Sequence, residues 1–245
     1  MLTIKNKADV AEIYIEDEII DDSEGGWLGD WRNGDTTGYG FPAKLRAQLD
    51  EVKDKPLEIH INSYGGSVFA GTAMANMIAN HKPKTTAIID GIAASIASQI
   101  FFAADECKMP SNAYLMIHRP FSITGGNSDD MRKAAEILDT LQNGIESTYR
   151  KKALDGVTDE EIHEMVNAET WFTGETAAQK FKITLTDPLK VLNCAGSKDK
   201  FQAMNFKNIP DTFKFSDNKT LPVTSDDNRI KIALAKANSL IMEMI

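Results

Sequence analysis

An apolar stretch near the middle of the chain, residues 85–104, shows the change of pattern around which we interpret the sequence. Thr85 to Ile89 is apolar and β-branched, which predicts a buried strand, and Ile96 to Ala104 predicts a buried helix. Asp90-Gly91 indicates a turn after the strand. We therefore expect Ser95 at a junction between strand and helix, among residues too small to cover its hydroxyl.

Two interpretations of Ser95 follow from this stretch alone. Serine commonly caps a helix through its side-chain oxygen, which makes a structural role the more frequent one. Alternatively, Ser95 is a nucleophile beside the first N–H groups of the helix, which have no partner within the helix and carry positive potential. Such groups can stabilise a developing oxyanion. The rest of the chain has to decide between the two.

Strands and helices alternate on both sides of this stretch. We predict these elements from apolar spacing: strands over 10–20, 57–62, 106–109 and 114–117, and helices over 41–52, 68–80, 128–153, 158–166 and directly after the cap residue Thr173. Residues 21–40, rich in Gly and Asp, are predicted to form a loop that holds Trp27 and Trp31. This order is typical of an α/β domain with a mainly parallel sheet and right-handed crossovers.

Three candidate groups fall directly after predicted strands: Gly65-Gly66, Ser95 and His118. In open α/β sheets, ligands bind beyond the carboxyl ends of the strands. A nucleophilic serine needs a base that takes its proton, and the base needs a carboxylate that orients it. His118 is the only one of the four histidines that follows a strand at this edge. The coincidence favours a nucleophile over a helix cap.

The longest predicted helix, 128–153, carries an apolar stripe at steps of three and four residues. The stripe consists of Met131, Ala134, Leu138, Leu141, Ile145 and Tyr149. We expect so long a helix to bury this stripe against another subunit, with packing on its own core as the alternative.

Three segments carry a resemblance to a known family: Ile61-Asn-Ser-Tyr-Gly-Gly66, Gly91-Ile-Ala-Ala-Ser95 and Met116-Ile-His118-Arg-Pro120. Together they resemble the signatures of ClpP, the Clp-type serine peptidase family, over roughly residues 10–187. The resemblance implies an α/β fold of ClpP/crotonase-like repeated β-β-α units with a long handle helix, followed here by a C-terminal tail. It implies Ser95 as nucleophile, His118 as general base, and the N–H groups of Gly66 and Ile96 as the oxyanion hole.

The third catalytic residue differs from the family pattern. The family's aspartate stands just before the segment that matches Trp171-Phe-Thr, and this chain has Glu169 there. A glutamate can orient an imidazole, but its additional methylene changes the geometry. Asp90 is the alternative because it is close to Ser95 in sequence, although its position suits a turn better.

Other departures resemble the ClpP-like proteases of phage and prophage head-assembly clusters. They are Tyr64 in place of the family's usual proline, the segment 21–40, and the tail after Pro188. The implied function is a serine endopeptidase that acts on polypeptides in a homo-oligomeric ring or stacked rings, in prohead or capsid maturation with capsid or scaffold proteins as partners.

Three alternatives to this function stay open. The first is a proteolytic subunit that works with a Clp ATPase in protein degradation. The second is a catalytically inactive ring-forming structural protein, and the third is an acyl-CoA enzyme of the crotonase type. The pairing of Ser95 with His118 favours a peptidase over the last of these.

Composition narrows the partners. The 245 residues carry a formal net charge of −9, which argues against a nucleic-acid or anionic membrane surface. No Walker motif, secretory signal or membrane-spanning run is found. Cys107 and Cys194 lie far apart and near no histidine, so no zinc site or disulfide is indicated. We expect no cofactor and no metal, and a cytoplasmic location.

The composition also suggests three parts. Residues 1–188 are predicted to form the peptidase domain, 189–225 a linker or flexible tail rich in Asn, Asp, Lys and Ser, and 226–245 a C-terminal amphipathic helix.

Overall fold

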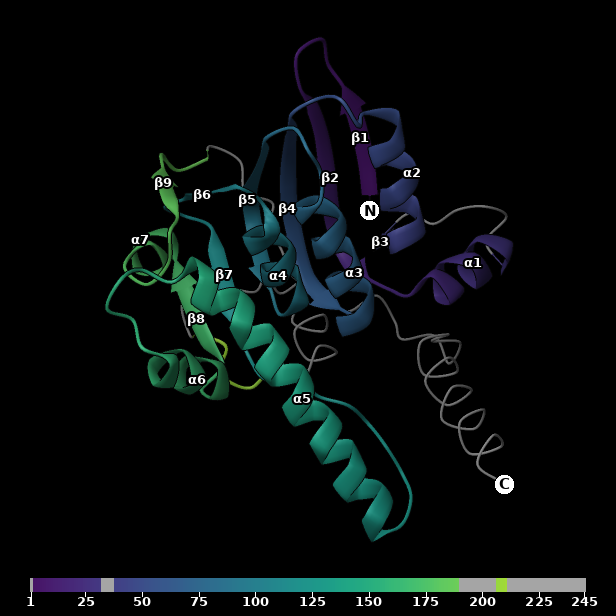
Figure 1. Cartoon of the computed structure of the whole chain (residues 1–245), viewed down its shortest axis with the longest axis vertical. Helices are drawn as coiled ribbons and strands as arrows, with labels where there is room; N and C mark the ends of the chain where they lie inside the picture. The colour runs from purple at the N-terminus through teal and green to yellow at the C-terminus, as the bar shows by residue number, and fades with distance from the viewer. Residues whose placement is uncertain (1, 32–37, 190–205, 211–245) are drawn as a thin grey trace, which may run out of the picture. The chain divides into compact units, whose positions relative to one another are not determined.

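The computed structural model describes residues 2–31, 38–189 and 206–210, and of 27–31 only the backbone. All of them belong to one compact unit, Met1–Phe213. In this part of the chain, nine strands form one mixed sheet, and seven helices accompany it (Figure 1). The predicted helix over 226–245, most of the predicted tail, and Cys194 lie outside the described residues.

The elements follow one another in the alternating order that the sequence predicts. The strands are β1 (Leu2–Asn6), β2 (Ala11–Ile19), β3 (Tyr39–Gly40), β4 (Leu57–Gly66), β5 (Thr85–Ala94), β6 (Glu106–Pro110), β7 (Tyr114–Ile117), β8 (Thr170–Thr173) and β9 (Thr184–Thr186). The helices are α1 (Asp22–Trp31), α2 (Pro42–Glu51), α3 (Val68–Ala79), α4 (Ile96–Ala103), α5 (Ser128–Lys152), α6 (Asp159–Asn167) and α7 (Gly174–Ala178).

The sheet is mainly parallel, as predicted. Its main path runs β1-β2-β4-β5-β6-β9, and only β1 is antiparallel to its neighbour within it. The first part of β5 pairs with β6, while its last residues pair with β7, which pairs in turn with β8. Because β5 and β7 run parallel, the residues that follow these two strands lie next to each other at one edge of the sheet.

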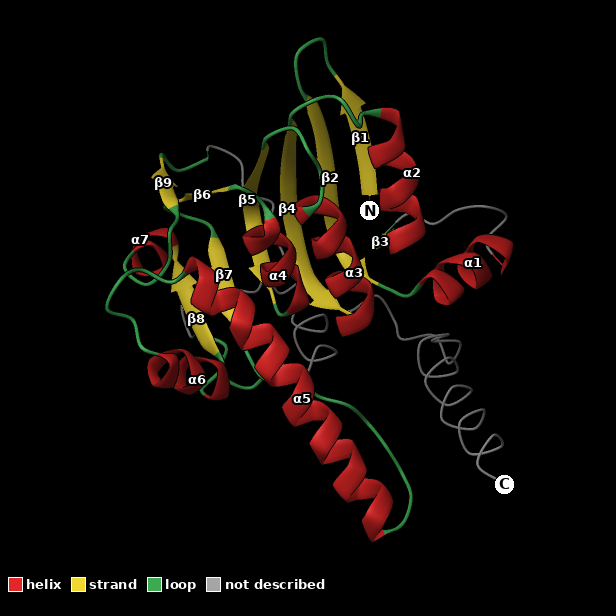
Figure 2. Cartoon of the chain, viewed as in Figure 1, coloured by secondary structure: helices red, strands yellow, loops and turns green. Residues whose placement is uncertain are grey.

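The core lies between the sheet and the helices α2, α3 and α4, which cover one of its faces (Figure 2). Along β4, buried and half-buried residues alternate strictly, because one face of the strand meets the helices. Helix α4 is buried over most of its length, including Ile100 and Phe101. Its apolar sequence therefore marks a core helix, as predicted.

Three predictions about the first half of the chain need correction. An additional strand, β1, precedes the one predicted over 10–20. Residues 22–31, predicted as part of a loop, form α1, whose glycines conceal its helical character in the sequence. Asp90-Gly91 is not a turn, because β5 continues to Ala94. Hydrogen bonding to β4 on one side and β7 on the other keeps this stretch extended despite its turn-forming residues.

Helix α5 begins at a capping box formed by Asn127 and Asp130, and it runs for 25 residues. Its buried residues all lie in its second half, which packs against α4 and α6. The first half extends away from the sheet (Figure 1) and exposes Met131 and Ile137. The chain's own core thus accounts for the second half of the apolar stripe.

The described helices include none with both the length and the apolar character that crossing a bilayer requires.

Two glycines in helices provide a matched test of this packing. A Cβ at Gly71 of α3 would lie 2.3 Å from Cγ1 of Ile96 in α4, whereas a Cβ at Gly144 of α5 would meet no atom within 4 Å. We expect Gly71→Ala to lower the free energy of unfolding by about 1–3 kcal/mol through overpacking. Gly144→Ala should raise it by roughly 0.5–1 kcal/mol, because alanine is the better helix former. Urea denaturation measures both, and a more stable Gly71→Ala protein would contradict the described contact of α3 with α4.

Candidate active site

Ser95 joins the end of β5 to the first residue of α4. Its backbone N–H donates to the carbonyl of Met116 at 3.0 Å, and its φ is 55°, in the left-handed region. Such a conformation costs a residue other than glycine about 1–3 kcal/mol and is often found at functional sites. Ser95 occupies the N-cap position, yet its side chain makes no capping hydrogen bond. Its hydroxyl is therefore not used to cap α4.

That hydroxyl faces His118, which follows β7. Nε2 of His118 lies 2.8 Å from Oγ of Ser95, within hydrogen-bonding distance. The pairing of Ala94 in β5 with Met116 in β7 fixes this arrangement, because both chains continue from there toward the same edge of the sheet. The structure thus brings together the serine and the histidine that the sequence analysis selected.

The other three histidines have different partners. His60 contacts Asp90, His81 contacts a backbone carbonyl of Lys55, and His163 contacts Glu146. Burial acts to lower the pKa of His60, but the hydrogen bond between its Nδ1 and Asp90 at 2.8 Å and the negative charges of Asp90, Glu12 and Glu58 together outweigh burial and raise it. Asp90 is therefore the partner of His60, and the suggestion that it orients His118 is wrong.

Glu169 stands between α6 and β8, next to His118. Strands β7 and β8 are antiparallel with Ile117 opposite Thr170, so the next position along each strand places His118 near Glu169. Glu169 is buried and also has a positive φ, 51°. Its charge acts on the His118 ring, although the described contacts include no hydrogen bond between the two side chains.

The pKa of His118 is held below its ordinary value of 6.5. Burial is the main cause, because it disfavours the charged imidazolium. The negative charge of Glu169 opposes this shift, and the positive charge of Lys207 adds to it. At neutral pH the ring is accordingly neutral, the form in which it can accept a proton.

Strand β4 ends in two glycines, of which Gly65 lies close to the serine and Gly66 close to Ile19 of β2. A Cβ at Gly65 would lie 2.8 Å from Cβ of Ser95 and 3.1 Å from the backbone nitrogen of Ile96. A Cβ at Gly66 would lie 2.0 Å from the carbonyl oxygen of Ile19. Both have positive φ, 95° and 144°, so only glycine suits this close approach of backbone to backbone. The end of β4 and the start of α4 therefore meet beside the serine.

A small pocket opens next to Ser95 and His118. The other residues that line it are mostly apolar: Val68, Ile96, Gln99, Pro120, Ile145 and Tyr149. The two polar side chains among them are engaged within the protein, since Gln99 donates to the carbonyl of Ile145 and the Tyr149 hydroxyl lies 2.7 Å from Oγ of Ser98. The pocket is thus suited to an apolar side chain of a ligand.

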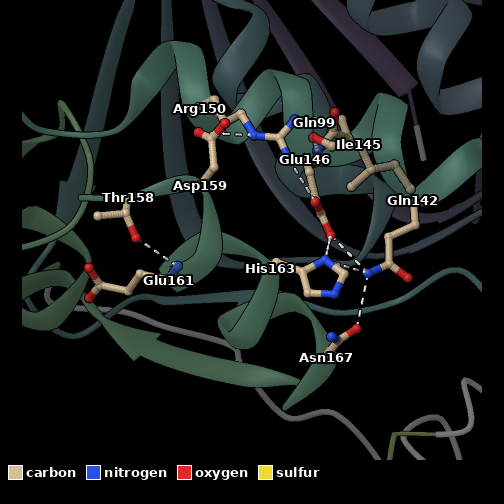
Figure 3. A network of polar contacts seen from close by, with 10 residues as sticks. All are labelled: Gln99, Gln142, Ile145, Glu146, Arg150, Thr158, Asp159, Glu161, His163 and Asn167. Carbon is tan, nitrogen blue, oxygen red and sulfur yellow. Dashed lines mark hydrogen bonds and ion pairs between the residues drawn. The ribbon is translucent and has the colours of Figure 1, made fainter. Parts of the chain in front are cut away.

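The buried carboxylate of Glu146 in α5 is the centre of a network of polar contacts near the site (Figure 3). Its side chain is 1% exposed, and it interacts with three side chains at 2.8–3.0 Å: Gln142, Arg150 and His163. Gln142 also bonds to Arg119, the neighbour of His118, and to Asn167, which lies two residues before Glu169. The network therefore braces both segments that carry His118 and Glu169.

Among the described residues, one group could hold a metal ion: Glu12, Glu58 and His60, whose ligand atoms lie within 4.8 Å of one another. Glu12 is already paired with Lys7 and with the Tyr14 hydroxyl. This group belongs to strands β2 and β4, apart from Ser95, and has no part in the site.

The structure adds residues that the sequence analysis did not select. Phe206 packs against the His118 ring, and the backbone N–H groups of Lys207 and Asn208 donate to the Glu169 carboxylate. They fall in the segment that composition assigns to a linker or tail, and no periodic pattern distinguishes them there.

Comparisons with known proteins agree with this geometry. The model of the family described as Clp protease matches residues 41–181, more than half of the chain. The chain belongs to the Clp protease family. It is 33% identical over 147 residues to an ATP-dependent Clp protease proteolytic subunit of Streptococcus suis, covering 58% of this chain and 73% of the relative.

Two further relatives define how far the likeness extends. The proteolytic subunit of Streptococcus pyogenes serotype M5 is 33% identical over 130 residues, and the match covers 51% of this chain and 64% of that subunit. A solved structure of a ClpP1 mutant from Listeria monocytogenes matches with a TM-score of 0.55 at 21% identity, covering 72% of this chain and 91% of the other. The latter confirms the expected fold. The segment at 206–210 lies beyond the matched Clp protease region.

The lowered pKa of His118 can be measured directly. We expect the ring nitrogens, observed by NMR in protein labelled with [¹⁵N]histidine, to titrate with a midpoint below 6.5. Glu169→Gln should lower the midpoint further, because a negative charge that favours the imidazolium is lost. The spectrum of His118→Gln assigns the resonance. A midpoint that rises in Glu169→Gln would contradict the described proximity of the two side chains.

Proposed function

We propose that this Clp protease family member is a serine endopeptidase in which Ser95, His118 and Glu169 act together. The observation that carries the proposal is the 2.8 Å contact between Oγ of Ser95 and Nε2 of His118, made by a serine with a positive φ. Family membership and the presence of a glutamate next to the histidine support it. Neither a metal nor a nucleotide takes part in the proposed reaction.

In the first half of the reaction, Oγ of Ser95 attacks the carbonyl carbon of a peptide while His118 accepts the hydroxyl proton at Nε2. The tetrahedral intermediate collapses as the imidazolium returns this proton to the leaving amine, which gives an acyl-enzyme. In the second half, water attacks the ester carbonyl while His118 accepts a proton from the water, and the imidazolium returns this proton to Oγ of Ser95 as the bond from Oγ to the acyl carbon breaks and the carboxylic acid product leaves. The negative charge of Glu169 stabilises the imidazolium in both halves.

The oxyanion is proposed to bind to the backbone N–H groups of Gly66 and Ile96. Ile96 is the first residue of α4, where N–H groups lack partners within the helix and the helix dipole is positive. The close approach of Gly65 to Ser95 and to the backbone nitrogen of Ile96 supports a second donor from the end of that strand, where Gly66 follows. Fixed donors of this kind contribute largely to acyl transfer, because they need no reorganisation when the charge develops.

The substrate side chain next to the cleaved bond is proposed to enter the apolar pocket beside Ser95. Val68 and Ile145 line it from opposite elements, α3 and α5, and neither offers a charge. Cleavage after apolar residues is therefore favoured over cleavage after charged ones, whose burial in such a pocket carries a desolvation cost.

A homo-oligomeric ring is the proposed setting for this chemistry. The first half of α5 exposes Ile137 with 56% of its surface accessible and Met131 with 38%. Apolar side chains in this position favour burial against a second copy of the chain. Met131 and Ile137 lie in the first half of α5, whereas the residues of this helix that line the pocket beside Ser95 lie in its second half. Assembly and the chemical step can therefore be tested separately.

For the biological role, we propose prohead or capsid maturation, on the basis of Tyr64 and of the sequence outside the Clp protease match. The alternative is a degradative subunit that works with a Clp ATPase, and the names of the streptococcal relatives favour it. Co-purification with a Clp ATPase and ATP-dependent degradation of an unfolded protein would decide for the alternative.

A fluorophosphonate probe tests the proposed chemistry. We expect the purified protein to be labelled at Ser95, and Ser95→Ala to take up no label. His118→Ala should lower the labelling rate by about 10³-fold or more, because the serine then lacks its base. Intact-mass spectrometry measures the uptake and its rate.

Ser128→Ala is the matched control, since this serine is exposed at the start of α5 and its hydroxyl accepts a hydrogen bond from Arg132 rather than facing a histidine. It should be labelled as fast as the unaltered protein. Intact rings without any labelling at Ser95 would contradict the proposal and favour the inactive structural protein instead.

A further inference from the structure

Residues 206–210 lie against the proposed catalytic residues, although they are distant from them in sequence. Phe206 is buried, with its ring centroid 5.6 Å from that of His118 at an interplanar angle of 79°. The same ring meets Trp171 of β8 edge-on, also at 5.6 Å. Edge-to-face contacts of this kind are favourable, so Phe206 fixes the segment beside the histidine.

From this anchor, the next two residues direct their backbone toward Glu169. The N–H of Lys207 donates to both carboxylate oxygens, at 2.8 and 2.9 Å, and the N–H of Asn208 donates to Oε1 at 2.8 Å. The amide side chain of Asn208 adds a 2.7 Å bond to the carbonyl of Ala168. Hydrogen bonds from N–H groups to a carboxylate are among the stronger ones in proteins.

The buried Glu169 carboxylate requires hydrogen-bond donors, and these bonds supply them. Its side chain has one more rotatable bond than an aspartate, and its carboxylate is buried, where a charged group requires partners. Apart from the segment, the hydrogen bonds described for this carboxylate comprise one long contact, from Nε1 of Trp171 at 3.4 Å. The segment thus supplies the closest hydrogen bonds that the described residues offer to this carboxylate.

The contact between this segment and Glu169 also affects His118, the proposed base. The carboxylate charge acts on His118 and favours its protonated form, which is the form that must be stabilised during the reaction. A carboxylate free to turn away would supply less of this stabilisation. The side-chain charge of Lys207 has the opposite effect on His118, so the backbone and the side chain of this residue can be separated by substitution.

Resting on the function proposed above, we propose that Lys207 and Asn208 are positioning residues. Their backbone N–H groups hold the Glu169 carboxylate beside His118, so a segment from beyond the Clp protease region completes the catalytic site. Hydrogen bonds from a distant part of the chain thereby compensate for the longer side chain of Glu169, which stands where the family has an aspartate.

The test compares proline and alanine at the same positions in the full chain. Lys207→Pro and Asn208→Pro remove the donating N–H groups, whereas Lys207→Ala and Asn208→Ala keep them. We expect each proline variant to react with the fluorophosphonate probe on the order of tenfold more slowly than its alanine control, since the orientation of a triad acid affects the rate strongly. In Lys207→Ala, the midpoint of the pH dependence should move up, because a positive charge near His118 is lost.

A double-mutant comparison separates positioning from a general structural effect. In a Glu169→Ala background, the proline and alanine variants should be labelled at equal rates, because no carboxylate remains to be held. A proline variant that is still slower in this background would show a structural defect and overturn the proposal.

Amide hydrogen exchange tests the contact without relying on activity. In Glu169→Ala, the amides of Lys207 and Asn208 should exchange at least tenfold faster than in the unaltered protein, because their acceptor is lost. Unchanged exchange would overturn the proposal.

The outcomes distinguish this inference from the proposed function. If the unaltered protein is not labelled at all, the proposed function fails and this inference with it. If it is labelled, and the proline variants react as fast as their alanine controls, the inference alone fails. Faster labelling of the proline variants would also overturn it, since the segment would then obstruct the site rather than complete it.

Discussion

The hydrogen bond between Ser95 and His118 depends on one feature of the sheet, the place where β5 leaves its pairing with β6 and pairs with β7. This change of neighbour puts the end of β7 beside the end of β5, so that His118 reaches Oγ of Ser95 at 2.8 Å. The positive φ of Ser95 and the glycines at the end of β4 are local consequences of the same crowded junction. The fold thus creates the site by bringing three strand ends together.

A second constraint acts on the acid side of the site. The buried carboxylate of Glu146 joins α5 to the end of α6, and Gln142 extends this network to Arg119. Breaking a buried charge network of this kind usually costs several kcal/mol, because the remaining groups lose their partners. His118 and Glu169, the proposed base and acid, are therefore supported by the same helix, whose first half leaves Met131 and Ile137 exposed.

Much of this arrangement follows from the sequence. Alternating apolar positions predicted most strands and helices, and the positions of Ser95 and His118 after strands selected two side chains that the structure brings within 2.8 Å of each other. Local patterns failed where tertiary pairing overrides them, as in the continuation of β5 through Asp90-Gly91. The contact of Phe206 with His118 could not be predicted either, because nothing periodic links a polar tail to a site that precedes it by many residues.

The most direct test of the central claim is a crystal structure of the protein treated with a peptide boronate that carries an apolar side chain. The account predicts a bond from boron to Oγ of Ser95, a boronate oxygen within hydrogen-bonding distance of the N–H groups of Gly66 and Ile96, and the apolar side chain in the pocket next to Val68. A boronate bound to another residue, or one on Ser95 with its oxygens directed away from both N–H groups, would contradict it.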